Sequence, residues 1–345
     1  GDAGAPTTSG PAAAVTDGPT TTKPVVVTTT TERPRRKTHL DQPLGFGMAG
    51  DDVVQVQRRL RQLGFAPGPI DGQFGGLTQA SVWAFEKLVL DTPRAEATGI
   101  VTDRMWQRMQ DDIRFEPRRP DADTADHTEV YLPQQVAIFF RDDEPVLITH
   151  ISSGTGERWC DEVTISPGEI GNVEGTEPLK RGECGVSDTP GGVYHYDRAV
   201  EGIRESALGS LWNPVYFNYG IAIHGAQTVP LYPASHGCIR MPLTISETFQ
   251  KFVSIGDAVY VFDGEHDPED TGSPPPTFNS LDPDYTTTTT STTSTTTTTT
   301  VPETTTPRTT EPEPEPTSPP RTTTTTSPPT TKPPRSDPTP PTSRP

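Results

Sequence analysis

The sequence is poor in hydrophobic residues, because only 30% of its 345 residues are apolar and only 7% are aromatic. It contains no run of about 18 apolar residues, so we expect no transmembrane helix. The shortage is greatest at the two ends, which are rich in Thr, Pro and Ser. Such segments bury too little apolar surface to offset the entropy of ordering. We therefore expect disordered arms over residues 1–43 and 265–345, with a globular region between them.

Cysteine is scarce as well, with three residues in the chain. Cys160 and Cys184 lie in an acidic, Gly-rich segment, and we expect them to pair in an oxidising compartment, with two buried free thiols as the alternative. In the chain-entropy model such a pair stabilises a fold by roughly 3.5 kcal/mol. Cys238 is then left over as a free thiol.

Basic residues are outnumbered, with 28 Lys and Arg against 46 Asp and Glu and a net charge of −18. Residues 129–264 alone carry 18 acidic and 8 basic side chains. Because this charge repels phosphates, the composition argues against a nucleic-acid partner. A short basic run in the N-terminal arm is typical of a solvated linker: Arg33, Arg35, Arg36 and Lys37.

The first half of the globular region has helical periodicity. Apolar residues recur on one stripe over 51–64 and again over 76–90, and a third helix is predicted to begin after Thr102 as its N-cap. These helices predict a small three-helix bundle over residues 44–113. Residues 114–128 are rich in Pro and Asp and are predicted to form a linker.

The second half, residues 129–264, has strand periodicity instead. Short apolar runs separated by turn residues occur at 130–132, 136–140 and 146–151, and more follow towards the end. One helix is expected at about 244–253. The predicted fold class is therefore a mainly β domain that follows a small N-terminal three-helix bundle, with disordered Thr/Pro-rich termini.

The most specific feature of the chain is a cysteine close to two histidines. His224 ends the apolar run Ile221–Ile223, and Cys238 follows in Ser235-His236-Gly237-Cys238-Ile239-Arg240. A thiol is a weak nucleophile until a base takes its proton, and imidazole is the usual base near neutral pH. We predict Cys238 as a nucleophile and His224 as its base, with His236 as the second candidate. The ordinary alternative is a buried structural cysteine, but that role does not require two histidines, glycines and an arginine nearby.

Glycines beside the cysteine allow backbone groups to approach a substrate. Backbone N–H groups around Gly237 and Cys238 are candidates for an oxyanion hole. No Asp or Asn stands out as an orienter of the base, and the carbonyl of Gly225 is the candidate for that role. Arg240 is a candidate clamp for a substrate carboxylate, with an internal salt bridge as the equal alternative.

A zinc site formed by His224, His236 and Cys238 is a weaker alternative, because the spacing fits known metal sites poorly and no acidic ligand is near. We therefore expect no metal and no cofactor. The remaining histidines that we considered have no cysteine nearby and are predicted to be core or surface residues: His127, His150 and His195.

The run Asp71-Gly72-Gln73-Phe74-Gly75, followed by Thr78, Ala80 and Phe85, resembles the peptidoglycan-binding domain of cell-wall enzymes. The resemblance covers residues 44–113 and implies that the bundle binds peptidoglycan. The alternative is that these residues only build the loop and core of the bundle.

Residues 129–264 resemble the L,D-transpeptidase catalytic domain. The resemblance lies in His224-Gly225, in Ser235–Arg240 and in Thr189-Pro190-Gly191-Gly192-Val193-Tyr194. It implies a β-sandwich or barrel around a cysteine nucleophile. Cys238 would attack the amide between the third-position diamino acid and the terminal D-Ala of a tetrapeptide stem, and an amine of a neighbouring stem would resolve the thioester. Candidate substrate-binding residues are Arg240, Ser235, Gly225, Tyr219, Gly220 and Tyr216.

Two features depart from the family pattern. Ten residues separate His224 from Ser235, which is short and predicts a reduced lid. The segment 157–185 reads as an insertion that reshapes access to the site.

The expected partners are peptidoglycan stem peptides and glycan, for a secreted, extracytoplasmic and monomeric wall enzyme whose N-terminal signal or anchor was removed. An L,D-carboxypeptidase, in which water resolves the thioester, stays open as an alternative. So do an inactive wall-binding structural protein and a zinc amidase or peptidase.

Overall fold

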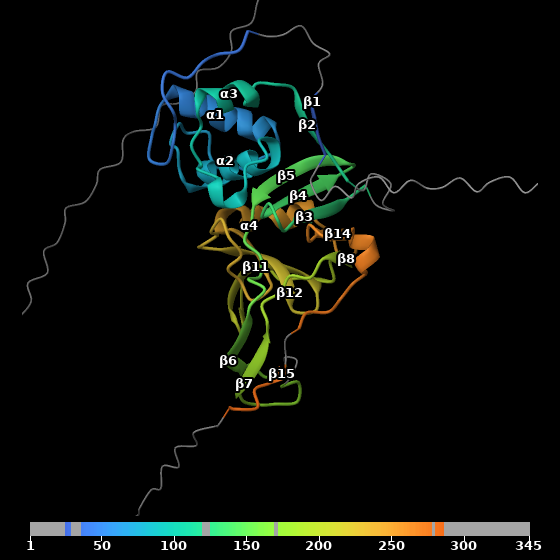
Figure 1. Ribbon diagram of the computed structural model, residues 1–345. Helices are drawn as coiled ribbons and strands as arrows, with labels where there is room; N and C mark the ends of the chain where they lie inside the picture. The colour runs from blue at the N-terminus through green and yellow to red at the C-terminus, as the bar shows by residue number, and fades with distance from the viewer. Residues whose placement is uncertain (1–24, 29–35, 119–124, 169–171, 278–279, 286–345) are drawn as a thin grey trace, which may run out of the picture. The chain divides into compact units, whose positions relative to one another are not determined.

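The protein is described by a computed structural model that covers residues 25–28, 36–118, 125–168, 172–277 and 280–285 (Figure 1). The predicted disorder of the Thr/Pro-rich arms falls mostly outside these residues, as do Arg33 and Arg35 of the basic run. Within the described ranges, no helix combines the length and the hydropathy needed to cross a membrane.

The predicted helices are confirmed: α1 (Asp51–Gln62), α2 (Gly76–Val89) and α3 (Asp103–Met109), with a short 3-10 helix η1 (Arg94–Glu96) between the last two. Thr102 caps α3, because its side chain accepts a hydrogen bond from the Met105 N–H at 3.2 Å. The apolar stripes face one core, in which Val53, Leu60 and Phe85 are fully buried.

The loop that carries the Asp-Gly motif is built around a buried glutamine of α1. The Gln57 amide donates to Asp71 Oδ1 at 3.1 Å and to the Gln73 carbonyl at 2.9 Å. The Gly72 N–H donates to Gln57 Oε1 at 2.9 Å. Phe74 is buried in the core of the bundle. These motif residues therefore have clear structural roles, whether or not the surface around them also binds a ligand.

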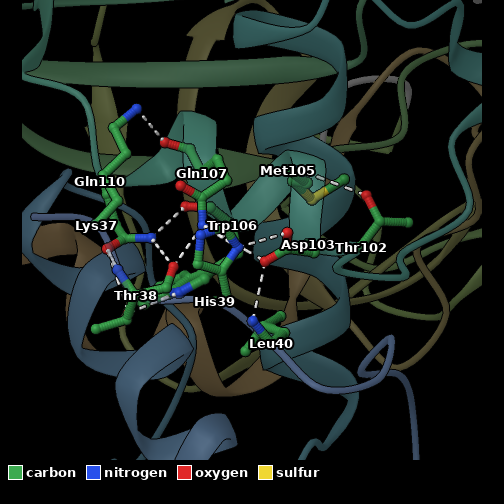
Figure 2. Close-up of polar contacts among 10 residues, drawn as sticks. All are labelled: Lys37, Thr38, His39, Leu40, Thr102, Asp103, Met105, Trp106, Gln107 and Gln110. Carbon is green, nitrogen blue, oxygen red and sulfur yellow. Dashed lines mark hydrogen bonds and ion pairs between the residues drawn. The ribbon is translucent and has the colours of Figure 1, made fainter.

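The predicted arm ends too late, because residues 37–40 are attached to α3 (Figure 2). Lys37 Nζ donates to the Gln107 carbonyl at 2.7 Å, and the indole of Trp106 donates to Thr38 Oγ1 at 2.9 Å. The Leu40 N–H donates to Asp103 Oδ1 at 2.9 Å. Lys37 is thus part of the fold rather than of a solvated basic patch.

The mainly β region contains a five-stranded sheet in the order β5-β4-β3-β14-β8. The strands are β3 (His127–Tyr131), β4 (Val136–Arg141), β5 (Glu144–His150), β8 (Gly192–His195) and β14 (Ala258–Phe262). Strand β14 pairs with β3 in parallel, and the other pairs are antiparallel.

A second sheet has the order β10-β11-β12-β13, with β9 also paired to β11. Its strands are β9 (Arg198–Ala199), β10 (Ile203–Ser206), β11 (Gly209–Asn218), β12 (Ile221–Ala226) and β13 (Ile239–Pro242). Apolar side chains of both sheets and of α4 (Leu243–Phe249), which the short helix η2 (Gln250–Phe252) follows, form one core. Phe139 of β4 and Phe249 of α4 meet there, with ring centroids 6.0 Å apart. The predicted mainly β architecture is confirmed.

The predicted insertion 157–185 forms a hairpin of β6 (Arg158–Ile165) and β7 (Leu179–Val186), and the tail adds β15 (Ser280–Leu281) to it (Figure 1). A disulfide joins Cys160 to Cys184 across the hairpin, as expected. The tail also forms α5 (Pro268–Thr271). The predicted end of the globular region at 264 is therefore too early.

The bundle is not separated from the sheet by a free linker. Strand β2 (Ile113–Glu116) pairs with β1 (Val25–Thr28), and the helices share one apolar cluster with residues of the first sheet, such as Ile138 and Tyr260. The chain after α1 covers the free edge of β5, where the Ile148 N–H donates to the Gly64 carbonyl at 2.8 Å. Helix α2 also packs against β5 (Figure 1).

Candidate active site

His224 and Cys238 lie on the same face of two adjacent strands. Strands β12 and β13 run in parallel, with Ile223 opposite Ile239 and His224 opposite Arg240. Alternate side chains of each strand enter the core, among them Ile221, Ile223, Ile239 and Met241. The intervening side chains therefore share the opposite face, where Cys238 packs against Ala222. Two extended segments thus bring together residues that are 14 positions apart in the chain.

Cys238 is a free, half-buried cysteine. Its thiol donates to the Gly220 carbonyl, with 3.6 Å between sulfur and oxygen. Burial raises the pKa of this thiol, while a hydrogen bond from the Ala222 backbone and the charge of Arg240 act in the opposite direction. The thiol is therefore protonated at neutral pH while the site is empty.

His224 is 4% exposed, and burial lowers its pKa to about 4. Its Nδ1 lies 2.9 Å from the Gly225 carbonyl, so a neutral ring donates there and leaves Nε2 free as an acceptor. The sequence predicted this carbonyl as the orienter of the base. Gly225 must be a glycine, because a Cβ would lie 2.1 Å from Ser246 Oγ.

The turn before Cys238 is held by side-chain hydroxyls. Ser235 Oγ accepts the Gly237 N–H at 3.1 Å and donates to the Cys238 carbonyl. Thr189 Oγ1 donates to the Gly237 carbonyl at 2.6 Å. Gly237 has φ +128°, and a Cβ there would lie 2.7 Å from the Asp188 carbonyl oxygen. Ser235 therefore supports the turn and occupies the Gly237 N–H. The sequence analysis did not predict that Thr189 also holds this turn.

His236 contacts the disulfide-linked β6–β7 hairpin. Its Nε2 lies 3.7 Å from Asp161 Oδ2, and its ring meets Trp159 edge-on, with centroids 5.2 Å apart. Trp159 and Asp161 flank Cys160 in β6. The sequence gave no signal for this contact, because it depends on how the inserted hairpin folds back on the turn.

The candidate substrate-binding residues differ in exposure. Tyr216 is buried beside Cys238, and Arg198 lies over its ring at 4.0 Å. Tyr219 is 67% exposed in the turn between β11 and β12, next to Gly220. Arg240 forms no ion pair with a carboxylate among the residues that the structure describes, and its charge acts on both His224 and Cys238. The internal salt bridge proposed for Arg240 is thus not seen within that part of the chain.

The zinc alternative finds no geometric support at His224, His236 and Cys238. In the described part of the chain, three ligand atoms of the metal-binding type converge at Cys160, Cys184 and Asp282, where both sulfurs are in the disulfide. The other histidines behave as predicted: His127 and His150 are buried, and His195 is on the surface.

Comparisons with known proteins identify the two domains of the chain. Residues 125–261 match the family model of the L,D-transpeptidase catalytic domain, and residues 49–109 match that of a putative peptidoglycan binding domain. An L,D-transpeptidase crystal structure from Xylanimonas cellulosilytica is 28% identical, with a TM-score of 0.51, over 67% of this chain and all of that one.

More distant solved structures include an L,D-transpeptidase from Stackebrandtia nassauensis, which is 20% identical over 64% of this chain and 95% of that chain, with a TM-score of 0.33. The C442S mutant of the Enterococcus faecium L,D-transpeptidase is 20% identical over 40% of this chain and 50% of that chain, with a TM-score of 0.28. No curated protein matches the chain. Taken with the first match, the family models show that the chain carries a catalytic domain of the L,D-transpeptidase family, preceded by a peptidoglycan-binding domain.

Proposed function

We propose that the chain is a cysteine-dependent L,D-transpeptidase that links peptidoglycan stem peptides between their third-position residues. The observation that carries the proposal is the shared face of β12 and β13. This supports the proposal because Cys238, which is free and half-buried, and His224 share that face, and the Gly225 contact at Nδ1 leaves Nε2 as the acceptor of a neutral ring.

In the first half of the reaction, Cys238 Sγ attacks the carbonyl carbon of the amide before the terminal D-Ala. Because thiol and imidazole are both neutral at rest, His224 Nε2 takes the thiol proton as the bond forms. The negative oxygen of the tetrahedral intermediate needs a backbone donor. We assign the Cys238 N–H to it, since the Gly237 N–H is held by Ser235 Oγ. Collapse of the intermediate breaks the amide, and protonated His224 gives its proton to the leaving amine of D-Ala.

In the second half, the amine of a neighbouring stem attacks the thioester and loses a proton to His224, and Cys238 is released as a thiol. The two products are a cross-linked dimer and free D-Ala. The Arg240 charge stabilises a developing thiolate and is also suited to a carboxylate of the substrate. We place Tyr216, Tyr219 and Gly220 along the donor stem, because the thiol bonds to Gly220, Cys238 packs against the cluster that contains Tyr216, and Tyr219 is the exposed neighbour of Gly220.

The wall-binding role of residues 49–109 is part of the same proposal. A protein that carries both domains acts outside the cytoplasm, where peptidoglycan lies. The disulfide of the β6–β7 hairpin is typical of an oxidising compartment, which supports secretion.

Incubation of the full chain with a disaccharide-tetrapeptide, followed by mass spectrometry, tests the proposal. A dimer that forms with loss of one D-Ala supports transpeptidation, whereas a tripeptide alone would indicate an L,D-carboxypeptidase. Cys238→Ala is the matched control and should abolish both products. Absence of any product, together with no carbapenem adduct on Cys238 of the folded wild type, would indicate an inactive wall-binding protein.

A further inference from the structure

A lysine of the peptidoglycan-binding domain is buried against the catalytic domain. Lys87 of α2 is 2% exposed, and its Nζ donates to the Gln135 carbonyl at 3.0 Å and to His150 Nδ1 at 2.8 Å. Burial lowers the pKa of this amine well below its ordinary value. A buried amine is costly unless its hydrogen bonds are made, so this position is maintained by the partners that it meets.

His150 carries the contact from Lys87 to the loop between His224 and Ser235. It is 1% exposed, and burial and the nearby Lys87 charge lower its pKa to about 3, so the ring is neutral. The two carbonyls beside Nε2 can only accept, so the hydrogen of the neutral ring lies on Nε2 and Nδ1 accepts from Lys87; the Gln135 carbonyl also lies 3.1 Å from Nδ1. That N–H points to the carbonyls of Val229 and Pro230, each 3.1 Å away.

Gln135 carries a second contact, to the C-terminal end of the same loop. Its side chain donates to Ser153 Oγ at 2.8 Å and accepts the Ser153 N–H at 2.8 Å. The Ser153 carbonyl in turn accepts the N–H groups of Ala234 and Ser235, at 2.9 and 3.0 Å. Ser235 then holds the turn of the nucleophile.

Gln135 has an unusual backbone conformation in the turn between β3 and β4. Its φ is +50°, a region that a side chain of this kind rarely adopts, yet the residue is fully buried. Such strain persists where surrounding contacts over-determine it. Here the carbonyl accepts from Lys87 and from the Ile151 N–H, and the carboxamide bonds to Ser153.

We propose that Lys87, Gln135 and His150 are positioning residues for the loop 226–234 that joins the base to the nucleophile. The peptidoglycan-binding domain is then a structural part of the catalytic site, because its buried amine acts through His150 on the middle of that loop and through Gln135 and Ser153 on its C-terminal end. The inference rests on the proposed function only in its effect on catalysis; the effect on the loop is independent of it.

The test uses full-length variants that break single contacts. Lys87→Met removes both donations. The amide of His150→Gln reaches the place of the ring Nε2 and keeps the donor to Val229 and Pro230, whereas the amide of His150→Asn reaches only the place of Nδ1. Tyr196→Phe is the control for loss of one buried hydrogen bond, because Tyr196 is fully buried and its hydroxyl donates to Thr128 Oγ1 at 2.8 Å.

Two readouts are measured: deuterium exchange of the amides of 226–238, and the rate at which meropenem, a carbapenem, acylates Cys238. We expect Lys87→Met and His150→Asn to exchange faster over this loop and to be acylated at least about tenfold more slowly. His150→Gln should stay within about threefold of wild type. Tyr196→Phe should lower the unfolding temperature without changing either readout.

The outcomes separate the two proposals. If exchange over 226–238 and acylation are both unchanged in Lys87→Met and His150→Asn, the positioning role is wrong. If His150→Gln behaves like His150→Asn, the loop contact through Nε2 is wrong. If wild type itself is not acylated, the proposed function fails, and exchange together with alkylation of Cys238 by iodoacetamide still decides the positioning role.

Discussion

The charge state of the thiol before substrate arrives is the sharpest prediction of the site. Burial raises the pKa of Cys238 above an ordinary value of 9.0, and burial lowers that of His224 to about 4. A thiol with a pKa above 9 is less than about 1% thiolate at pH 7, and each unit of further increase removes another factor of ten. The pair should therefore rest as thiol and imidazole, and become ionic only as substrate reacts.

Iodoacetamide reports this state directly, because it alkylates the thiolate and Cys238 is the one cysteine outside the disulfide. In the full chain, the alkylation rate should rise about tenfold for each pH unit between 6 and 9, with its midpoint above 9. Cys238→Ala is the control and should take up no label. A midpoint at or below pH 7 would show a preformed thiolate–imidazolium pair and would refute the reasoning.

Three further predictions concern the frame of the site. Gly237→Ala should slow acylation of Cys238 by at least about tenfold and lower the free energy of unfolding by about 1–3 kcal/mol, because φ is +128° and the Cβ would meet the Asp188 carbonyl; mass spectrometry and urea titration check this. Thr102→Ala should cost about 1 kcal/mol of unfolding free energy in the same titration, since it removes the cap of α3, and unchanged stability would contradict that role. His224 and His150 are neutral in the fold, with pKa values of about 4 and about 3, but protonate near 6.5 when unfolded. Stability should therefore be fully present above about pH 6.5 and fall as pH decreases towards 4, and denaturant midpoints that stay constant over this range would contradict it.

The residues of the candidate site could be predicted from the sequence because they lie in short segments with local patterning. The apolar alternation of β12 and β13 fixes which side chains share a face, and so His224 and Cys238 follow from local patterning. The Gly225 carbonyl and the Cys160–Cys184 pair were also predicted and are present. Each depends on neighbours in sequence or on simple pairing.

Contacts that depend on tertiary packing were not readable in this way. Lys87 lies in an amphipathic helix, where a lysine is ordinarily solvated, and its burial results from the docking of α2 on β5. The contact between His236 and Asp161 likewise requires the folded hairpin. The ends of the globular region were placed wrongly for a related reason: Lys37 lies in a segment whose composition predicts disorder, and it is fixed by partners more than sixty positions away.

The covered edge of β5 has a practical consequence. Its Ile148 N–H is bonded to the Gly64 carbonyl, so the segment that follows α1 shields a sheet margin which otherwise offers unpaired backbone groups. A shortened protein with only the catalytic half would expose that sheet edge together with apolar side chains such as Phe140. Exposed sheet edges of this kind pair with strands of other molecules and cause aggregation. Poor solubility of a trimmed enzyme would then reflect the missing cover rather than a fault in the catalytic half.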